Sequence, residues 1–373
     1  MRTIAFGSTN LYKGLRTGGI DGIGRYCQEL IKQFQKDSSL NIAPFTFGEQ
    51  RRPGINCITL PSYYSYLPRA HLQAALGMAD LNFSKVDLIH ATDQWMPLVK
   101  DRPIIATVMD SIPLSHPQYM RASFRYLKSF FWKQLTRKAD HIITISEFSK
   151  SEIAKHFNYP EHQISSIPLG VDESYCDSIS VREIKAVLEK FSLPENFFIS
   201  IGTLQPRKNT ITLLKAHSQL PPKLAKDFPI VIVGRSGWDK NQEIELAIQA
   251  SSAKGECIWI NYITEFEKRS LLQKAIGMPF ISLYEGFGLP IVEAFASGTP
   301  VITSNITSMP EVSGDSALLV DPNNIDEITY ALLRLIEDQT LRKSLKEKGI
   351  TRSKKYSWEN TAIETKKIYG KYC

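Results

Sequence analysis

Ser282-Leu-Tyr-Glu-Gly-Phe-Gly-Leu-Pro-Ile-Val-Glu-Ala-Phe-Ala-Ser-Gly-Thr-Pro-Val301 is the stretch that decides the fold of this 373-residue chain. It predicts the end of a strand, a glycine turn, a short helix and the start of the next strand. Pro290 suits the first helical position, because the N–H that proline lacks would be unpaired there. Gly298 suits the left-handed residue that follows a helix, and Pro300 prevents the helix from continuing.

Two glutamates of this segment are predicted to lie beside the start of its helix. Glu285 falls in the loop before the helix, and Glu293 falls in its first turn. The unpaired N–H groups of residues 286–289 and the positive end of the helix face the same space as Glu285. This arrangement predicts a pocket for a phosphate with hydroxyl-rich groups on either side. The plainer alternative is an acidic helix start, since carboxylates favour that end; the complete run of glycines and prolines favours the pocket.

The same segment resembles the E-x7-E signature of glycosyltransferase family 4, whose members are retaining enzymes with the two-domain GT-B architecture. The resemblance implies that Glu285 and the amides of the glycine turn hold the sugar of a nucleotide-sugar donor. It also implies that the second glutamate hydrogen-bonds the ribose of the nucleotide. The donor-binding residues implied in this segment are Glu293, Gly286, Phe287, Gly288 and Leu289.

The length of the chain predicts two α/β domains, because 373 residues exceed one ordinary core. Apolar runs alternate with amphipathic stretches, which is typical of parallel sheets with crossover helices. We expect a first domain over residues 1–172 and a second over 173–356. The resemblance implies the GT-B form of this α/β class: two Rossmann-like domains facing an interdomain cleft, with the C-terminal helix 357–373 returning to the first domain. Strands are expected at 2–7, 42–47, 86–90, 103–108, 140–145, 164–168, 197–201, 229–233, 257–260, 279–283, 300–303 and 317–320.

Two further loops follow expected strands of the second domain, where parallel sheets bind ligands. Gly202 opens a loop that contains Arg207 and Lys208, which match the cation pair that the family places at the donor pyrophosphate. Such a pair stabilises the departing diphosphate, because negative charge develops there as the glycosidic bond breaks. No Asp-x-Asp motif occurs in the sequence, so no metal site is expected. The other loop, with Gly234 and Arg235, suits the wall of a nucleotide pocket.

The first domain carries two loops of interest. One is glycine-rich and is expected to open a helix over 25–34, offering backbone N–H groups to a phosphate or an acceptor. Its form resembles mannosyl- and rhamnosyltransferase-like members of the family. The second loop follows the strand 103–108, where Met109 replaces the histidine that relatives place on the transferred sugar and Asp110 becomes the expected acceptor-side contact. The acceptor or phosphate-loop residues expected here are Gly22, Gly24, Arg25, Tyr26 and Met109.

Positive charge is concentrated in the first domain. Residues 1–172 carry 20 Lys and Arg against 14 Asp and Glu, and residues 111–139 carry six basic residues and no acid. Aromatic residues are interleaved with these charges, as in helices that contact an anionic membrane surface. The alternative is a core helix with solvated lysines. Nucleic acid is not expected as a partner, because no binding motif accompanies the charge.

The sequence therefore predicts a retaining, metal-independent hexosyltransferase. Its catalytic residues would be Glu285, Arg207, Lys208 and Asp110. Its donor would be a nucleotide-diphosphate sugar, with GDP-mannose as first choice, and its acceptor a glycan or lipid-linked oligosaccharide; no cofactor is expected. Five scattered cysteines and an N-terminus that opens on a strand favour a cytoplasmic protein, peripheral at most on the membrane. Two alternatives stay open: a nucleotide-sugar epimerase of the same fold, and a catalytically silent nucleotide-binding scaffold subunit.

Overall fold

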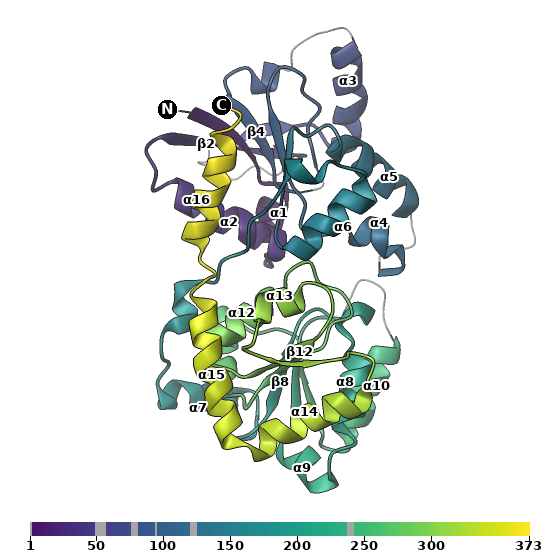
Figure 1. The fold of residues 1–373 in the computed structure, drawn as a ribbon, viewed down its shortest axis with the longest axis vertical. Coiled ribbons are helices and arrows are strands. Elements are labelled where there is room, and N and C mark those ends of the chain that lie inside the picture. Colours follow the sequence, from purple (N-terminus) through teal and green to yellow (C-terminus); the bar gives the residue numbers. More distant parts are fainter. Residues whose placement is uncertain (1, 49–56, 76–80, 94, 120–124, 237–241) are drawn as a thin grey trace. The chain divides into compact units, whose positions relative to one another are not determined.

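The computed structural model describes residues 2–48, 57–75, 81–93, 95–119, 125–236 and 242–373. The chain divides into two compact units (Figure 1). Unit 1 is formed by Met1–Gly170 and Trp358–Cys373, and unit 2 by Val171–Ser357. The expected boundaries lie two residues and one residue from these. The last helix thus belongs to the same unit as the N-terminus, and unit 1 is discontinuous in sequence.

Unit 1 is built on a seven-stranded sheet in which every paired strand is parallel. Its spatial order is β3-β2-β1-β4-β5-β6-β7. The six strands expected in this half are present, and one short edge strand, β3, was not expected. The strands are β1 (Arg2–Gly7), β2 (Leu40–Phe47), β3 (Ile58–Leu60), β4 (Leu88–Ala91), β5 (Ile104–Thr107), β6 (His141–Thr144) and β7 (Ile164–Ser166).

Unit 2 holds two three-stranded parallel sheets, ordered β10-β9-β8 and β11-β12-β13. A single parallel bridge between Phe198 and Gly277 joins β8 to the start of β11, so the two sheets continue one another. All six strands expected in this half are confirmed. They are β8 (Phe198–Ile201), β9 (Ile230–Val233), β10 (Cys257–Ile260), β11 (Met278–Phe280), β12 (Val301–Ser304) and β13 (Leu318–Val320).

Helices connect most of the successive strands in both units, as is typical of parallel pairing. In unit 1 they are α1 (Thr9–Thr17), α2 (Gly22–Phe34), α3 (Tyr63–Ala75), α4 (Ile112–Ser115), α5 (Arg125–Thr136), α6 (Glu147–Phe157) and α16 (Trp358–Tyr369). In unit 2 they are α7 (Val181–Lys190), α8 (Thr210–His217), α9 (Pro222–Asp227), α10 (Gln242–Ala253), α11 (Glu265–Lys274), α12 (Leu289–Ala296), α13 (Met309–Ser313), α14 (Ile325–Glu337) and α15 (Gln339–Ser353).

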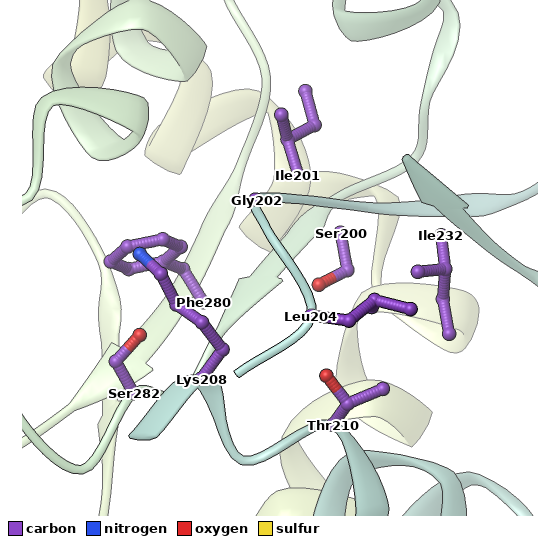
Figure 2. Close-up of a pocket in the computed structure, with 9 residues that line it drawn as sticks. All are labelled: Ser200, Ile201, Gly202, Leu204, Lys208, Thr210, Ile232, Phe280 and Ser282. Carbon is purple, nitrogen blue, oxygen red and sulfur yellow. The ribbon is translucent and has the colours of Figure 1, made fainter. Parts of the chain in front are cut away.

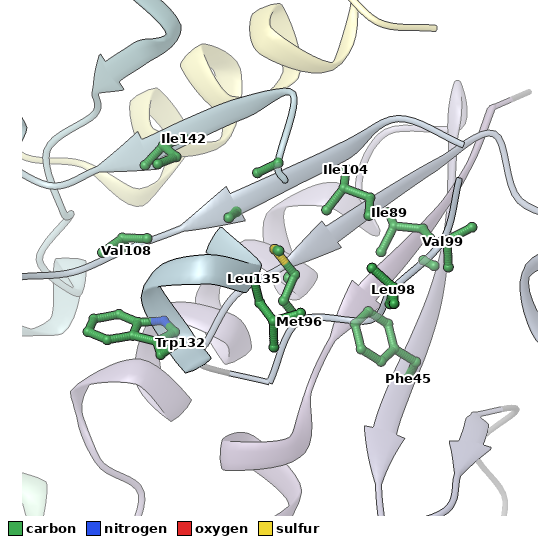
Figure 3. Packing of buried hydrophobic residues seen from close by; sticks show 14 of the residues in the cluster. Phe45, Ile89, Met96, Leu98, Val99, Ile104, Val108, Trp132, Leu135 and Ile142 are labelled. Carbon is green, nitrogen blue, oxygen red and sulfur yellow. The ribbon is translucent and has the colours of Figure 1, made fainter. Parts of the chain in front are cut away.

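The aromatic residues of α5 point in two directions. Trp132 is buried and packs with Leu135 in the core of unit 1, together with Phe45 of β2 and Ile142 of β6 (Figure 3). Phe130 and Phe131, in contrast, are 54% and 52% exposed. One face of α5 therefore anchors the helix, and another presents an apolar pair to solvent. Arg121, Phe124 and the side chains of residues 125–128 lie outside the described part of this basic segment.

The glycine-rich loop of unit 1 is shorter than expected. The helix α2 begins at Gly22, whereas the sequence predicted a start at Arg25. Asp21 caps this helix, because its side chain accepts a hydrogen bond from the N–H of Gly24 at 2.7 Å. Gly22 and Gly24 thus form the first helical turn, and their N–H groups remain at a helix N-terminus.

Candidate functional site

Three charged side chains meet at the carboxyl ends of the strands of unit 2. Arg207 and Lys208 belong to a short 3-10 turn, Pro206–Lys208, that follows β8, and Glu285 lies in the loop that follows β11. Lys208 Nζ lies 2.5 Å from Glu285 Oε1, and Arg207 Nη1 lies 2.9 Å from Glu285 Oε2. All three side chains are less than one-fifth exposed. The sequence predicted each of them, and the structure brings them together.

Burial and pairing compete in this cluster. Burial acts to raise the pKa of Glu285, but Lys208 and then Arg207 outweigh it and hold that pKa below its usual value. Burial lowers the pKa of Lys208, and the carboxylate beside it opposes that shift. An ionised carboxylate is thus kept inside unit 2 by its two cations, as buried charges require. One carboxylate thus pairs with two cations, and the cluster keeps a net positive charge.

The loop that carries Glu285 is fixed by its own backbone. Gly288 has φ +102° and precedes Leu289, the first residue of α12. Ser308 Oγ lies 3.0 Å from the carbonyl oxygens of both Glu285 and Phe287, to which it donates. Pro290 occupies the second helical position, one later than predicted. Glu293 consequently falls in the second turn of α12 and not the first.

The C-terminal end of α12 is as predicted. Gly298 has φ +73°, a left-handed conformation that favours glycine, and it follows the last helical residues directly. Pro300 then precedes the strand β12. The helix is therefore held to eight residues.

Two glycines allow neighbouring loops of unit 2 to meet. A Cβ placed on Gly234 would lie 1.9 Å from the carbonyl oxygen of Gly202, so only glycine fits there. The loops are also joined by a hydrogen bond of 2.9 Å from the N–H of Leu204 to the carbonyl of Arg235. The Arg235 guanidinium lies 5.1 Å from the centroid of the Tyr262 ring, which is 58% exposed. The backbone of the two loops and the exposed Arg235–Tyr262 pair thus line this edge of the sheet.

A small pocket lies beneath these loops (Figure 2). The side chain of Lys208 crosses it, with Nζ 4.7 Å from the centroid of the Phe280 ring. Its walls come from the ends of β8, β9 and β11, as predicted for the ligand edge of an open parallel sheet. The lining residues are Ser200, Ile201, Gly202, Leu204, Lys208, Thr210, Ile232, Phe280 and Ser282.

Glu293 is held by a second group of side chains that the sequence analysis missed. Lys268 Nζ lies 2.7 Å from Glu293 Oε2, and the Tyr175 hydroxyl lies 3.3 Å from Glu293 Oε1 and 2.7 Å from Glu265 Oε2. Lys268 lies in α11, the helix that follows β10. Its position in the sequence could have indicated a site residue, because ligand contacts gather near the carboxyl ends of parallel strands. Tyr175 gave no such signal.

The predicted residues of unit 1 have different surroundings. Asp110 accepts a hydrogen bond of 3.0 Å from the N–H of Ile112, and Met109 is half-buried. Arg25 forms an ion pair of 3.4 Å with Glu29. Tyr26 is 1% exposed, and its hydroxyl lies 3.0 Å from Thr107 Oγ1. Its side chain therefore packs in the core of unit 1, because an aromatic ring at this position of α2 faces the sheet.

In the part of the chain that the structure describes, none of the helices combines the length and apolar character that a membrane span needs.

Two family models match the chain. The model described as Glycosyltransferase Family 4 matches residues 20–175, and the model described as Glycosyl transferases group 1 matches residues 182–352. The two matches fall on unit 1 and unit 2 almost separately.

Curated relatives and solved structures agree with these matches. O-antigen chain mannosyltransferase B of Escherichia coli is 33% identical over 369 residues, which cover 94% of this chain and 96% of that protein. Serotype-specific mannosyltransferase WbdA of Escherichia coli is 29% identical over 262 residues, 68% of this chain but 31% of that longer protein. The structure of Anabaena Alr3699/HepE in complex with UDP and glucose has a TM-score of 0.76 at 17% identity and covers 100% of both chains, a likeness of fold.

Proposed function

The chain belongs to glycosyltransferase family 4, and from this premise we propose that it transfers mannose from GDP-mannose to a growing glycan with retention of configuration. Its fold is GT-B, and it is a glycosyltransferase that adds a sugar to a glycan acceptor. The proposal of mannose is supported by the names of the relatives, which are mannosyltransferases. The epimerase and scaffold alternatives are not favoured by these relatives.

The cluster of Glu285, Arg207 and Lys208 is the observation that carries the proposed mechanism. A bound diphosphate presents the anionic oxygens that Arg207 and Lys208 recognise, with arginine forking onto two oxygens and lysine acting as a point charge. As these cations turn to the diphosphate, the Glu285 carboxylate becomes available to the hydroxyls of the donor sugar. The two cations then stabilise the charge that develops on the leaving group. The ion pairs of 2.5 and 2.9 Å in the free protein are thus exchanged for contacts with donor.

Retention is proposed to proceed by front-face attack of the acceptor hydroxyl. The acceptor oxygen forms its bond to the anomeric carbon as the bond to the diphosphate breaks, and the leaving phosphate takes the acceptor proton. Glu285 would orient the sugar hydroxyls and would form no covalent bond. Arg207 and Lys208 supply the positive charge, so the reaction is proposed to need no divalent metal.

The proposed acceptor is a glycan on a lipid carrier, and the proposed contact with its membrane is α5. This helix exposes Phe130 and Phe131, whose rings lie 5.8 Å apart, edge to face. Arg137 and Lys138, just after the helix, are exposed as well. An apolar pair beside positive charge complements an anionic bilayer surface, where aromatic rings enter the interface and cations meet the head groups.

A donor panel tests the proposal. The full chain is incubated with GDP-mannose, GDP-fucose, UDP-glucose and UDP-galactose, with and without a mannose-terminated acceptor, and products are followed by mass spectrometry. We expect a mass gain on the acceptor with GDP-mannose, and slow release of GDP without acceptor. Transfer only from a UDP-sugar would overturn the donor assignment. Isomerisation of the donor in the absence of acceptor would support the epimerase alternative. The absence of turnover, together with the absence of any nucleotide-induced thermal shift, would support the scaffold alternative.

A further inference from the structure

We infer that Lys268 and Tyr175 are positioning residues that fix the Glu293 carboxylate for the ribose of the donor nucleotide. The inference rests on the proposed function, which assigns a nucleotide to unit 2, and it adds two residues to which no role has been given. Neither side chain needs to touch the donor. Both act through Glu293.

The ion pair of Lys268 with Glu293 sets the direction of the carboxylate. Lys268 Nζ lies 2.7 Å from Oε2, and the two side chains are only 15% and 11% exposed. A pair so shielded loses little of its strength to salt and solvent, compared with an exposed pair. The same ammonium lies 5.4 Å from the centroid of the Tyr175 ring, within the range of a cation–π contact. Lys268 is therefore held from two sides.

The Tyr175 hydroxyl donates to two carboxylates, those of Glu265 and Glu293. A phenol has one proton to donate, and the oxygen of Tyr175 lies 2.7 Å from Glu265 Oε2 but 3.3 Å from Glu293 Oε1. Both oxygens lie within donating distance, so the hydroxyl shares its proton between Glu265 and Glu293 and braces the Glu293 carboxylate through Oε1. A carboxylate offers about four lone-pair sites, so hydroxyls of a ribose still find acceptors on Glu293.

The chain supports this bracing from three elements. Glu265 and Lys268 are three residues apart in α11 and so face the same way. Tyr175 lies in a 3-10 turn, Glu173–Cys176, that opens unit 2, and it is 2% exposed. Glu293 comes from α12. The competing explanation is purely structural, in which these side chains only tie the turn to the two helices. A comparison of nucleotides that carry ribose with nucleotides that carry 2′-deoxyribose distinguishes the two explanations.

The test measures binding of GDP and UDP, and of their 2′-deoxy forms, to the full chain by calorimetry. We expect wild type to prefer the ribonucleotide. In Lys268→Met and Tyr175→Phe, affinity for the ribonucleotide should fall roughly 10- to 150-fold, the loss expected for one hydrogen bond to a charged group, while the deoxy form changes much less. Donor KM should rise while kcat at saturating donor stays within about threefold, because the ribose does not change in the reaction. Lys268→Arg should restore part of the preference.

Lys274→Met is the matched control. Lys274 is in the same helix and forms an ion pair of the same length, 2.7 Å, but with the exposed Glu195, so its removal should leave both affinities unchanged. If the variants keep the wild-type preference for ribose, or lose both nucleotides equally, the inference is overturned while the proposed function stands. If the wild-type protein binds no nucleotide, the inference and the proposed function are both overturned. Should Lys268→Met fail to fold, Tyr175→Phe and Glu265→Gln test the same point.

Discussion

Glu285 remains ionised inside unit 2 because two cations outweigh its burial. Removing one partner of such a group leaves unpaired charge and costs more than the net value of the pair. An alanine at position 285 would therefore disturb folding and catalysis together. The isosteric amide keeps the shape and removes the charge, so it is the better probe of the reaction.

Glu285→Gln should slow turnover, and Glu293→Gln should instead weaken donor binding. The first residue is proposed to meet a sugar that becomes cation-like, and loss of such a contact costs ~2–4 kcal/mol, or roughly 30- to 1000-fold in kcat. The second is proposed to meet ribose, which binds ground state and transition state alike, so donor KM rises with little change in kcat. Steady-state kinetics on both variants measure the split, with thermal unfolding as the folding control. Equal losses of kcat would refute this division.

Lys208→Met should abolish most transfer, and excess EDTA should leave wild-type activity intact. The reason is that Arg207 and Lys208 are proposed to carry the charge stabilisation that a metal supplies in other enzymes. Rates are measured with and without EDTA, and Lys215→Met in α8 is a control for loss of a lysine from the same unit. Complete loss with EDTA that added Mg²⁺ or Mn²⁺ reverses would contradict the cation-pair mechanism.

At this scale, the structure brings together three predicted residues that each follow a strand. Arg207, Lys208 and Glu285 each come soon after a predicted strand, and strand ends of a parallel sheet meet at one edge. Tyr175 was not predictable in this way, because its contact with Glu293 joins residues 118 positions apart and its ring is buried as an ordinary core residue would be. The burial of the Tyr26 ring was not predictable either, because it depends on the direction that the helix α2 gives to the side chain.

At the scale of elements, apolar runs that alternate with amphipathic stretches located twelve strands, whereas the starts of α2 and α12 were displaced by three residues and one residue. The start of α2 moved to Gly22 because Asp21 caps it, and the start of α12 moved to Leu289 because Gly288 adopts the left-handed conformation. Caps depend on side-chain geometry that spacing alone does not specify. The short edge strand β3 was not predicted.

Gly234→Ala should destabilise unit 2 and weaken donor binding together. Its Cβ would lie 1.9 Å from the Gly202 carbonyl oxygen, a backbone atom that cannot rotate away, so the loops after β8 and β9 must separate. Forcing an atom into packed structure costs about 1–3 kcal/mol. Denaturant unfolding and GDP binding measure the two effects. Gly370→Ala is the control, since its Cβ would come no closer than 3.6 Å to a neighbouring atom, which is an ordinary van der Waals contact; unchanged binding in Gly234→Ala would show that these loops do not form the donor site.

Replacing Phe130 and Phe131 by serine should reduce sedimentation of the protein with anionic liposomes. The rings are proposed to enter the bilayer interface, and Arg137 and Lys138 to contact its head groups. Raising the ionic strength until it screens these charges should therefore also release the protein from the liposomes. Tyr330→Ser removes an aromatic ring that is 64% exposed on unit 2 and is the matched control. Sedimentation of the double variant equal to that of wild type would favour the reading of α5 as a core helix only.

At the scale of the whole molecule, unit 1 closes with the last helix of the chain. The ring of Trp358, at the start of α16, lies 6.4 Å from that of Tyr26, and Tyr369, at its end, lies 5.7 Å from Phe34. The Tyr369 hydroxyl also lies 2.6 Å from His90 Nδ1. The resemblance implied that this helix returns to the first domain, but its buried polar anchor was not predictable, because His90 and Tyr369 are 279 residues apart.

That anchor predicts how stability depends on pH. Burial lowers the pKa of His90 to about 3, and its second nitrogen lies 2.6 Å from Thr107 Oγ1. The unfolded chain protonates a histidine below about pH 6.5. Between these values the unfolded state binds one more proton, so His90 makes the free energy of unfolding fall by about 1.4 kcal/mol for each pH unit of acidification. Asp93 acts oppositely, because burial raises its pKa to about 7 and the folded state there binds the extra proton.

The variant His90→Gln isolates the histidine from these opposing groups. We expect the slope of unfolding free energy against pH between pH 4 and 6 to be smaller in His90→Gln than in wild type by about 1.4 kcal/mol per pH unit. The contributions of Asp93 and other groups are common to both proteins and cancel in the difference. Urea titrations across this range measure the slope, and His162→Gln, at an exposed position, is the control that should leave it unchanged. Identical slopes in wild type and His90→Gln would show that His90 takes up its proton in the folded state, and that the contact holding α16 to β4 and β5 survives with a charged imidazole.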